Sequence, residues 1–435
     1  MKISLFQGIL FGVFGIGAVI GLIVFATHTG TPSKSDTIGT VVVWGTLPKA
    51  GVRNALVAAT QIDQTLKGVS YVEKDPATLP SDLSAAIVTG DAPDLVLASQ
   101  EELVSLAKFI APIPLATLPA STFVDTFIQE GSLFTVPDNG GYYGIPFLVD
   151  PIVLFSNHTI LSSSGIARPP STWEALVGLV PNIAILTPTQ QITRGLIALG
   201  TYDNVHNARG ILSTIFLQTG VPLSSYAPSG NLVANLGERA VSGTPPGQAV
   251  VGFYTQFADP SKVSYTWNAS LPDSQQEFLA GDLALYLGYA SEARFFTQAN
   301  PNLNFEVTHV PQPATATAKS VYGLVYAFMI PRGAGNAVGA YQAAALLTNS
   351  AEQIAAAGAT GLAPATLNQL AQPPSDPVAA VAYTEALYAS GWLSPAPADT
   401  DSVFSSMIGN VISRRSSIGI ALASAGQTLT SLLQK

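Results

Sequence analysis

The stretch from Gly141 to Leu176 constrains the fold of this chain more than any other part of the sequence. An apolar, β-branched run from Ile152 to Phe155 has the length and composition of a buried strand. Two prolines after Arg168 force extended backbone, and Ser171 or Thr172 can then cap a helix. The stretch therefore predicts a strand followed by a capped helix, as expected of an α/β protein.

Two further segments predict buried strands that end next to polar or aromatic side chains. Gly39 to Trp44 is a β-branched run followed closely by Thr46, and Asp91 to Ala98 gives a turn and a strand before Ser99. Ligands of α/β sheets bind outside the carboxyl ends of the strands. We therefore expect Trp44, Thr46 and Ser99 near a cleft, although Trp44 would serve equally well as a packed strand end.

Composition limits the classes of protein to which the chain can belong. Its 435 residues are enough for two domains of ordinary size. Charged residues make up 10% and the formal net charge is −9, so the sequence offers no basic surface for nucleic acid. Cysteine is absent, which excludes disulfides, thiolate catalysis and zinc held by cysteine.

The beginning of the chain predicts a membrane segment. No charged side chain occurs from Ile3 to Thr27, and about 20 apolar residues span the core of a bilayer. Lys2 places the N-terminus inside. The apolar run exceeds a usual signal-peptide core, so we predict an uncleaved signal-anchor; cleavage after Val24-Phe25-Ala26 is the alternative. A stalk up to residue 37 would follow, with the main domain extracytoplasmic on a single-pass anchor in the cell membrane.

The order of motifs in the middle of the chain resembles a known family. Gly-Ile-Pro, an acidic residue, an apolar strand ending at Asn157, a short helix and Pro-Pro-Ser-Thr-Trp-Glu follow one another. This order resembles bacterial extracellular solute-binding proteins of ABC importers, in particular the sugar-binding, maltose-binding-protein-like group. Phe278, Gly281 and Ala284 also match the family pattern F-x-x-G-x-x-A-M, with Leu285 in place of methionine.

The resemblance implies a fold and a division of the chain. The expected fold is α/β, with two periplasmic-binding-protein-like lobes joined by a hinge of crossing segments and preceded by one transmembrane helix. Residues 1–37 would form the anchor and stalk, residues 38–149 plus 322–360 the first lobe, and residues 150–321 plus 361–435 the second lobe. The partners implied are a sugar or oligosaccharide and an ABC transporter permease.

Sugars present flat apolar faces rimmed by hydroxyl groups, so their sites combine aromatic side chains with carboxylates and amides. The resemblance implies that Asp150 contacts the ligand. Gln218 is either an amide ligand or part of a helix cap, and Trp267 and Trp392 are either platforms or core residues. The predicted ligand-binding set is Trp44, Thr46, Ser99, Phe147, Asp150, Asn204, Gln218, Trp267, Tyr289, Glu292 and Trp392.

The sequence gives little support for an enzyme. None of its four histidines has a metal-ligand spacing such as H-E-x-x-H, and no G-x-S-x-G elbow, S-x-x-K pair or Walker loop occurs. We therefore predict no catalytic residue, no metal and no cofactor, and a protein that delivers its solute to a permease. Two alternatives stay open: a tethered surface receptor without a transport role, and a glycan hydrolase using Asp150 and Glu292.

Overall fold

A computed structural model describes residues 38–237 and 244–435. The predicted membrane segment at residues 3–27 and the stalk that follows it lie outside the described residues. In the part of the chain that is described, no helix is both long and apolar enough to cross a membrane.

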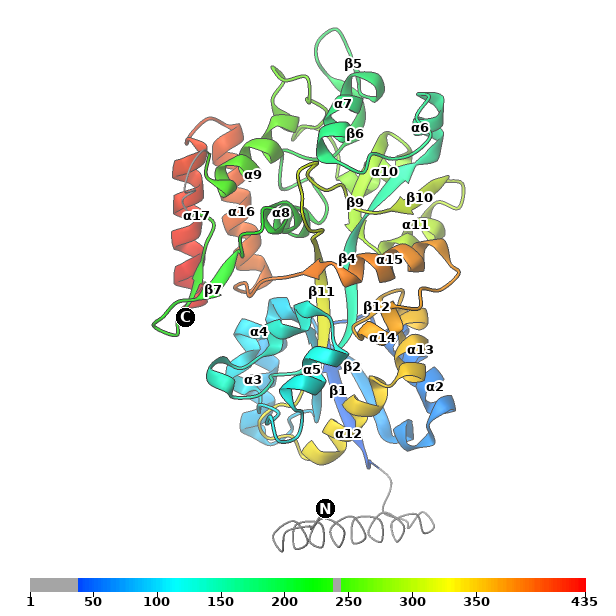
Figure 1. Cartoon of the computed structure of the whole chain (residues 1–435), viewed down its shortest axis with the longest axis vertical. Helices are drawn as coiled ribbons and strands as arrows, with labels where there is room; N and C mark the ends of the chain where they lie inside the picture. Colours follow the sequence, from blue (N-terminus) through cyan, green and yellow to red (C-terminus); the bar gives the residue numbers. More distant parts are fainter. Residues whose placement is uncertain (1–37, 238–243) are drawn as a thin grey trace, which may run out of the picture.

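Two lobes are stacked along the long axis of the molecule, with a narrow waist between them (Figure 1). The lower one, lobe 1, contains the strands β1 (Val41–Gly45), β2 (Val69–Glu73), β3 (Leu95–Ser99) and β12 (Ala363–Pro364). Its helices are α2 (Lys49–Ile62), α3 (Leu79–Thr89), α4 (Gln100–Leu106), α5 (Ala120–Thr126), α12 (Ala337–Leu347), α13 (Ser350–Thr360) and α14 (Leu367–Leu370).

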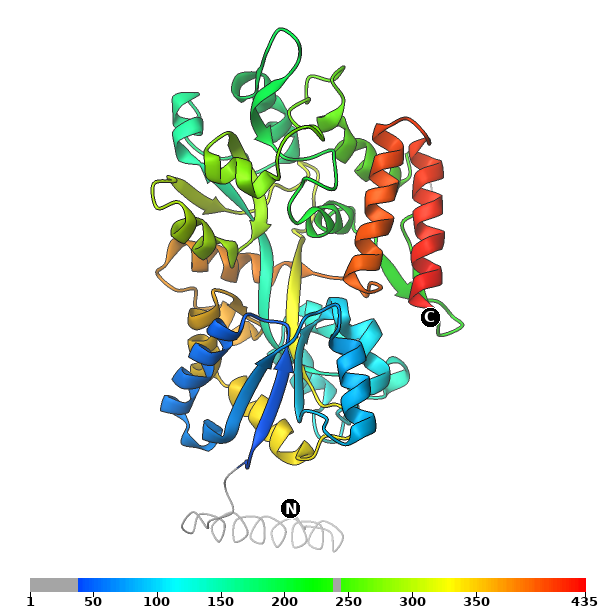
Figure 2. The same ribbon diagram turned by 180° about the vertical axis from the view of Figure 1, so that it is seen from behind.

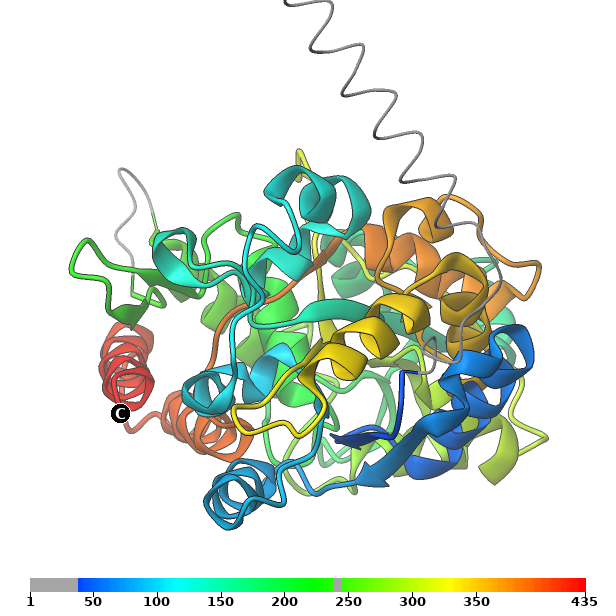
Figure 3. The same cartoon turned by 90° about the horizontal axis from the view of Figure 1, so that it is seen from below.

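The upper lobe, lobe 2, has a comparable α/β organisation. Its strands are β5 (Ile185–Leu186), β6 (Ile192–Ile197), β9 (Leu283–Tyr289), β10 (Phe305–Thr308) and the hairpin of β7 (Ser224–Tyr226) and β8 (Leu232–Ala234). Its helices are α6 (His158–Ser163), α7 (Trp173–Ile183), α8 (Ala208–Leu217), α9 (Pro246–Thr255), α10 (Ser274–Ala280), α11 (Glu292–Ala299), α15 (Pro377–Leu387), α16 (Pro397–Ile412) and α17 (Ile418–Leu433). Seen from below, α16 and α17 (red) lie on the opposite side of the molecule from α2 (blue) (Figure 3).

Two long antiparallel strands cross the waist and belong to both lobes. β4 (Ile145–Asn157) pairs with β11 (Val321–Met329), and every residue of β4 is buried. The sheet runs in the order β2-β1-β3-β11-β4-β9-β6-β5, so a single sheet passes through the whole molecule. The strand predicted at Ile152 to Phe155 is therefore the second half of a longer one, since the chain stays extended through Pro146 and Pro151.

Lobe 1 also contains residues after position 361 that the sequence analysis assigned to lobe 2. β12 pairs with the lobe 1 half of β4, at Val149 and Leu148. The backbone N–H of Ile128 donates to the carbonyl of Ala365, which follows β12 directly. The predicted boundary at residue 361 stays a prediction, but in the structure the last passage between the lobes comes after α14.

The helix predicted after the two prolines is confirmed as α7. Its N-cap is Thr172, whose hydroxyl accepts a hydrogen bond from the backbone N–H of Ala175 at 3.2 Å. Trp173, the first helical residue, is buried and donates its indole N–H to Oε1 of Gln218 at 2.7 Å. An N-cap of this kind stabilises a helix by about 1 kcal/mol, and here it also fixes the tryptophan that joins α7 to α8.

An aromatic cluster fastens β4 to lobe 2. The ring of Phe155 lies 5.1 Å from that of Phe296 and 5.8 Å from that of Tyr286, and Phe278 completes the group. Edge-to-face aromatic pairs add about 0.5–1.5 kcal/mol beyond the burial of their area. The cluster holds β9 and α11 in place, and with them the residues at the end of β9 that face lobe 1.

Candidate functional site

The parallel strands of both lobes end at the gap between the lobes. β4 runs from lobe 1 into lobe 2, and β11 runs the opposite way. β3 is antiparallel to β11 and parallel to β1, so the lobe 1 strands run toward the gap. β9 is antiparallel to β4 and parallel to β6, so these strands reach the gap from above. Ligands bind beyond the carboxyl ends of such strands, which makes the gap the candidate site.

An ion pair crosses this gap beside β11. Arg209, near the start of α8 in lobe 2, donates from Nε to Oε1 of Glu101 at 2.9 Å and from Nη2 to Oε2 at 2.8 Å. Glu101 lies in the first turn of α4 in lobe 1. Nη1 of Arg209 also donates to Oδ2 of Asp401 on α16 at 2.5 Å. One guanidinium therefore links two elements of lobe 2 to one element of lobe 1.

Two tyrosines extend this ion pair on either side. The hydroxyl of Tyr322 on β11 donates to Oε1 of Glu101 at 2.5 Å, and that of Tyr202 donates to Oδ1 of Asp401 at 2.5 Å. Burial and the nearby Glu101 raise the pKa of Tyr322 well above its ordinary value. Burial alone would lower the pKa of Arg209, but Glu101 more than compensates and the net shift is upward. The phenols thus stay protonated as donors and the guanidinium stays charged.

A cavity of about 430 Å³ opens beside Arg209 on the lobe 2 side. Sites for small molecules occupy about 300–1,000 Å³ and combine apolar walls with a few placed polar groups. The lining residues are Tyr202, Asp203, Val205, His206, Asn207, Ala208, Arg209, Gly210, Asp273, Tyr289 and Asp401. All of them belong to lobe 2, and the set joins two aromatic rings to carboxylates, an amide and a guanidinium.

The start of α8 is held in an unusual backbone conformation. Asn207 is its N-cap and has φ +60°, a left-handed conformation that most side chains avoid. Nδ2 of Asn207 donates to Oε1 of Glu292 at 2.6 Å and to the hydroxyl of Tyr286 at 3.1 Å. Strained residues held by side-chain hydrogen bonds often lie at functional sites. Here the two bonds tie the residue before the first turn of α8 to β9 and to the start of α11.

The two acidic residues in the predicted set, Asp150 on β4 and Glu292 at the start of α11, both bond residues at or just after the end of β9. Asp150 is 6% exposed and accepts hydrogen bonds from the backbone N–H of Ser291 at 3.1 Å and its hydroxyl at 2.5 Å. Burial raises the pKa of Asp150 to about 7. Glu292 accepts from Asn207 and also from the backbone N–H of Tyr289 at 2.7 Å. Both carboxyl groups therefore hold in place the residues at the end of β9.

Two other predicted residues, with the lysine beside them, line the lobe 1 side of the gap. Trp44 is half-buried at the end of β1, and Nζ of Lys74 lies 3.8 Å from the centroid of a ring of its indole. Thr46 follows it, also half-buried, with its backbone N–H bonded to the carbonyl of Leu97. Among the predicted residues, Tyr289 is half-buried and lines the cavity beside Arg209.

The remaining predicted residues are directed into the lobes. Phe147 packs on Phe328 in the core of lobe 1, with ring centroids 4.6 Å apart. The hydroxyl of Ser99 caps α4 by accepting from the N–H of Glu101. Trp392 is 2% exposed and donates its indole N–H to the hydroxyl of Ser213.

The same is true of the predicted amides. Gln218 donates from Nε2 to the carbonyls of Pro311 and Ser320, in addition to its bond with Trp173. Oδ1 of Asn204 accepts from Trp267, which is 1% exposed. As ligand contacts, Asn204, Gln218 and Trp267 stay predictions, but each already satisfies its polar groups inside lobe 2.

Sequence analysis missed the residues that form the ion pair. Glu101, Arg209, Asp401 and Tyr202 were absent from the predicted set, although Glu101 directly follows a strand end that was assigned to the cleft. One signal was available: the chain has only 18 Lys and Arg residues, so an arginine at the start of an apolar helix is unusual. Nothing in the sequence, however, shows that it meets Glu101, which lies 108 positions away.

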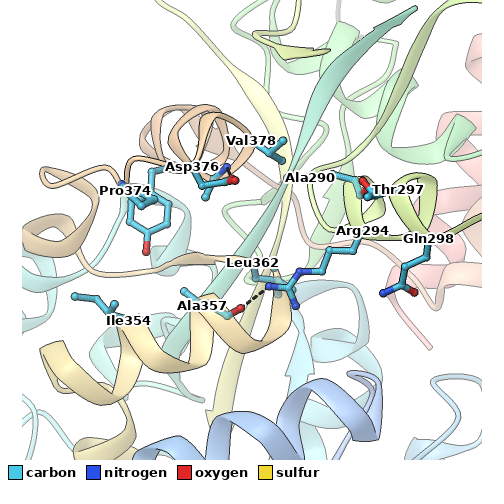
Figure 4. A pocket seen from close by; sticks show the side chains of 15 residues that line it. Ala290, Arg294, Thr297, Gln298, Ile354, Ala357, Leu362, Pro374, Asp376 and Val378 are labelled. Atoms are coloured by element: carbon cyan, nitrogen blue, oxygen red, sulfur yellow. Dashed lines mark hydrogen bonds between the residues drawn. The ribbon is translucent and has the colours of Figure 1, made fainter. Parts of the chain in front are cut away.

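A second hollow of about 480 Å³ lies on the other side of β4 and β11, between α11, α13 and α15 (Figure 4). Figure 2 shows α11 and α13 on one side of the crossing strands and α8 and α16 on the other. Arg294 of α11 donates to the carbonyls of Ala359, at 2.6 Å, and Gly358, at the end of α13. The walls of this groove are mostly apolar, with Ile354, Ala357, Leu362 and Val378 among them. It offers fewer polar groups than the cavity beside Arg209.

The described residues contain no group of three or more His, Cys, Asp or Glu side chains placed to hold a metal ion.

Comparison with known proteins identifies the family. A family model described as bacterial extracellular solute-binding protein matches residues 56–384. The chain belongs to this family of bacterial extracellular solute-binding proteins. Its family and fold are those of binding proteins and not of enzymes, as the sequence analysis predicted. No curated protein sequence matches the chain.

Solved structures confirm the two-lobe periplasmic-binding-protein-like fold. A cyclo/maltodextrin-binding protein complexed with maltotetraose is 14% identical with a TM-score of 0.72, over 93% of this chain and 99% of that chain. A cyclic alpha-maltosyl-1,6-maltose binding protein from Arthrobacter globiformis is 16% identical with a TM-score of 0.72, over 91% and 99%. The Thermus thermophilus maltotriose binding protein bound with maltotriose is 17% identical with a TM-score of 0.64, over 90% and 99%.

Proposed function

We propose that the chain is a membrane-anchored, extracytoplasmic solute-binding protein that captures a sugar or oligosaccharide between its lobes and delivers it to an ABC transporter permease. The observation that carries the proposal is the cavity at the carboxyl ends of the strands, where Tyr202 and Tyr289 stand beside Asp401 and Arg209. Aromatic rings stack on the apolar faces of sugars, and carboxylate and guanidinium groups bond their hydroxyls.

Three further points support parts of the proposal. The similar solved structures include proteins described as bound to maltotetraose and to maltotriose, which supports an oligosaccharide. Membership of the solute-binding family supports a permease partner. The uncharged run from Ile3 to Thr27 supports a single-pass anchor in the cell membrane.

The proposal is tested by thermal unfolding of the full-length chain with a library of neutral sugars, amino sugars, polyols and oligosaccharides. A ligand that binds the folded state stabilises it, by about 2.7 kcal/mol at a concentration of a hundred times its Kd, and so raises the melting temperature. We expect at least one carbohydrate to do so. A library without a hit would count against sugar capture.

One observation favours a second candidate, a tethered surface receptor that does not take part in transport. The Arg209–Glu101 pair joins the lobes through groups of the chain itself, so a joined state needs no solute. A receptor would show no carbohydrate hit and would not stimulate ATP hydrolysis by a co-reconstituted permease. A glycan hydrolase is no longer proposed, since the family is one of binding proteins.

A further inference from the structure

Both carboxylate oxygens of Glu101 are used in a contact that spans the lobes. Oε1 accepts from Nε of Arg209 and from the hydroxyl of Tyr322, and Oε2 accepts from Nη2 of Arg209. The Glu101 side chain is 4% exposed and that of Arg209 is 20% exposed. Parallel, two-point pairing of arginine with a carboxylate is among the strongest and most directional polar contacts in proteins.

Separating the lobes would break the two-point contact between Arg209 and Glu101. Glu101 would keep the hydrogen bond from Tyr322, and Arg209 would keep the one to Asp401. Charge-assisted, two-point hydrogen bonds at a largely buried position favour the arrangement that forms them. The gap therefore favours the joined arrangement of the lobes by the chemistry of the chain alone.

The cavity beside the ion pair lies wholly on lobe 2. Its walls come from the start of α8, from Asp273 before α10, from Tyr289 at the end of β9 and from Asp401 in α16. A solute in this cavity would contact Arg209 and Asp401, which line it, whereas Glu101 does not line it. It can be held without any contribution from lobe 1.

We propose that the Arg209–Glu101 pair is an interlobe latch that keeps the lobes joined before a solute arrives, so that the solute is loaded onto lobe 2 of an already joined molecule. The second half of this statement rests on the proposed function, whereas the first half does not. With the latch formed, solute binding is expected to change the distance between the two lobes of this chain very little.

The distance between the lobes can be measured directly, because the chain has no cysteine of its own. Val88 on α3 in lobe 1 is 85% exposed and Val263 in lobe 2 is 76% exposed. The full-length chain with Val88→Cys and Val263→Cys would carry a spin label at each position, and pulsed electron paramagnetic resonance would give the distance distribution. No solute is needed for the first measurement.

We expect one narrow distribution without solute, and a longer mean distance when Arg209→Gln or Glu101→Gln is added. Glu101→Asp keeps the charge but is too short for the two-point contact, so it tests geometry apart from charge. Arg194→Gln is the matched control, because Arg194 is bonded within lobe 2 to the carbonyl of Ile183. Circular dichroism would show that each variant is folded.

The latch is overturned if Arg209→Gln and Glu101→Gln, both folded, give the distribution of the unsubstituted labelled protein. It is also overturned if that protein shows a broad distribution that narrows only when a carbohydrate from the thermal screen is added. A failed carbohydrate screen would refute the proposed function and leave the solute-free distances, and thus the latch, standing.

Discussion

Asp150 and Ser291 join the strand that crosses the waist to the end of β9. Oδ1 of Asp150 accepts from the backbone N–H of Ser291 at 3.1 Å, and Oδ2 accepts from its hydroxyl at 2.5 Å. The carboxyl group is nevertheless so deeply buried that its pKa rises from 3.8 to about 7. A buried carboxyl group on the strand that crosses the waist is thus close to titration at neutral pH.

The first prediction concerns the dependence of stability on pH. The folded chain keeps a proton on Asp150 that the unfolded chain releases, so this group stabilises the fold below about pH 4 and loses that contribution as the pH rises toward 7. Asp150→Asn should flatten the decline in unfolding free energy between these limits by about 2–4 kcal/mol. Urea denaturation at a series of pH values measures it. If the unfolding free energy of Asp150→Asn fell with pH as steeply as that of the unsubstituted chain, Asp150 would not be the cause of the decline.

Ser291→Ala provides a second arm. The hydroxyl of Ser291 stabilises the charged form of Asp150 and so lowers its pKa against the effect of burial. Removing it should raise the pKa of Asp150 further and so move the upper end of the decline in stability to higher pH. Observation of a downward shift would refute the hydrogen bond.

The second prediction concerns the ion pair as a contribution to stability. Glu101→Gln should lower the unfolding free energy by about 2–4 kcal/mol, because it leaves Arg209 poorly compensated at a largely buried position. The pair of Lys74 and Asp82, whose side chains are 21% and 37% exposed, is the comparison, because its carboxylate is far more exposed than that of Glu101. Asp82→Asn should cost less than about 1 kcal/mol. Equal losses of unfolding free energy in Glu101→Gln and Asp82→Asn would contradict a larger contribution from the buried pair.

The third prediction separates two tryptophans of the predicted set. Trp44 is half-buried at the gap, whereas Trp267 is 1% exposed within lobe 2. Trp44→Ala should have a small effect on stability and should leave the affinity for the carbohydrate unchanged, because the cavity beside Arg209 is lined by lobe 2 alone. Trp267→Ala should lower stability by about 3–5 kcal/mol. Calorimetric titration measures the affinity and denaturation measures the stability. A large loss of stability in Trp44→Ala with a small one in Trp267→Ala would contradict the burial of the two side chains.

The fourth prediction assigns the solute to one of the two hollows. Asp401→Asn removes a carboxylate from the wall of the cavity beside Arg209 and should weaken binding about tenfold, as expected for a charged hydrogen bond. Arg294→Gln alters the groove between α11 and α13, and the affinity should stay as it was. A loss of affinity in Arg294→Gln alone would place the solute in that groove.

The sequence predicted the fold well because local signals and order along the chain determine it. The strand around Ile152, the helix capped by Thr172 and the strand ends at Trp44 and Ser99 all depend on residues close together in the chain. The same reasoning expected the strand ends at Trp44 and Ser99 to lie near a cleft, and in the structure both strands run toward the gap between the lobes.

The site was less accessible to sequence reasoning because side-chain direction is decided by packing. Trp267 and Trp392 have the chemistry of sugar platforms, but both point into lobe 2, where Asn204 and Ser213 accept from their indole groups. Arg209 meets Glu101 through the approach of α8 to α4 in space, which no spacing in the sequence encodes. Residue chemistry indicated the kind of site, whereas the residues that line the cavity beside Arg209 are brought together only by the fold.

The central claim is that a carbohydrate binds between the lobes beside Arg209. Hydrogen exchange of the full-length chain, with and without a carbohydrate from the thermal screen, tests this most directly. We predict slower exchange in residues 202–210 and around Asp401, with at most small changes around Gly358. Protection confined to the groove of α11, α13 and α15, or none in residues 202–210, would contradict it.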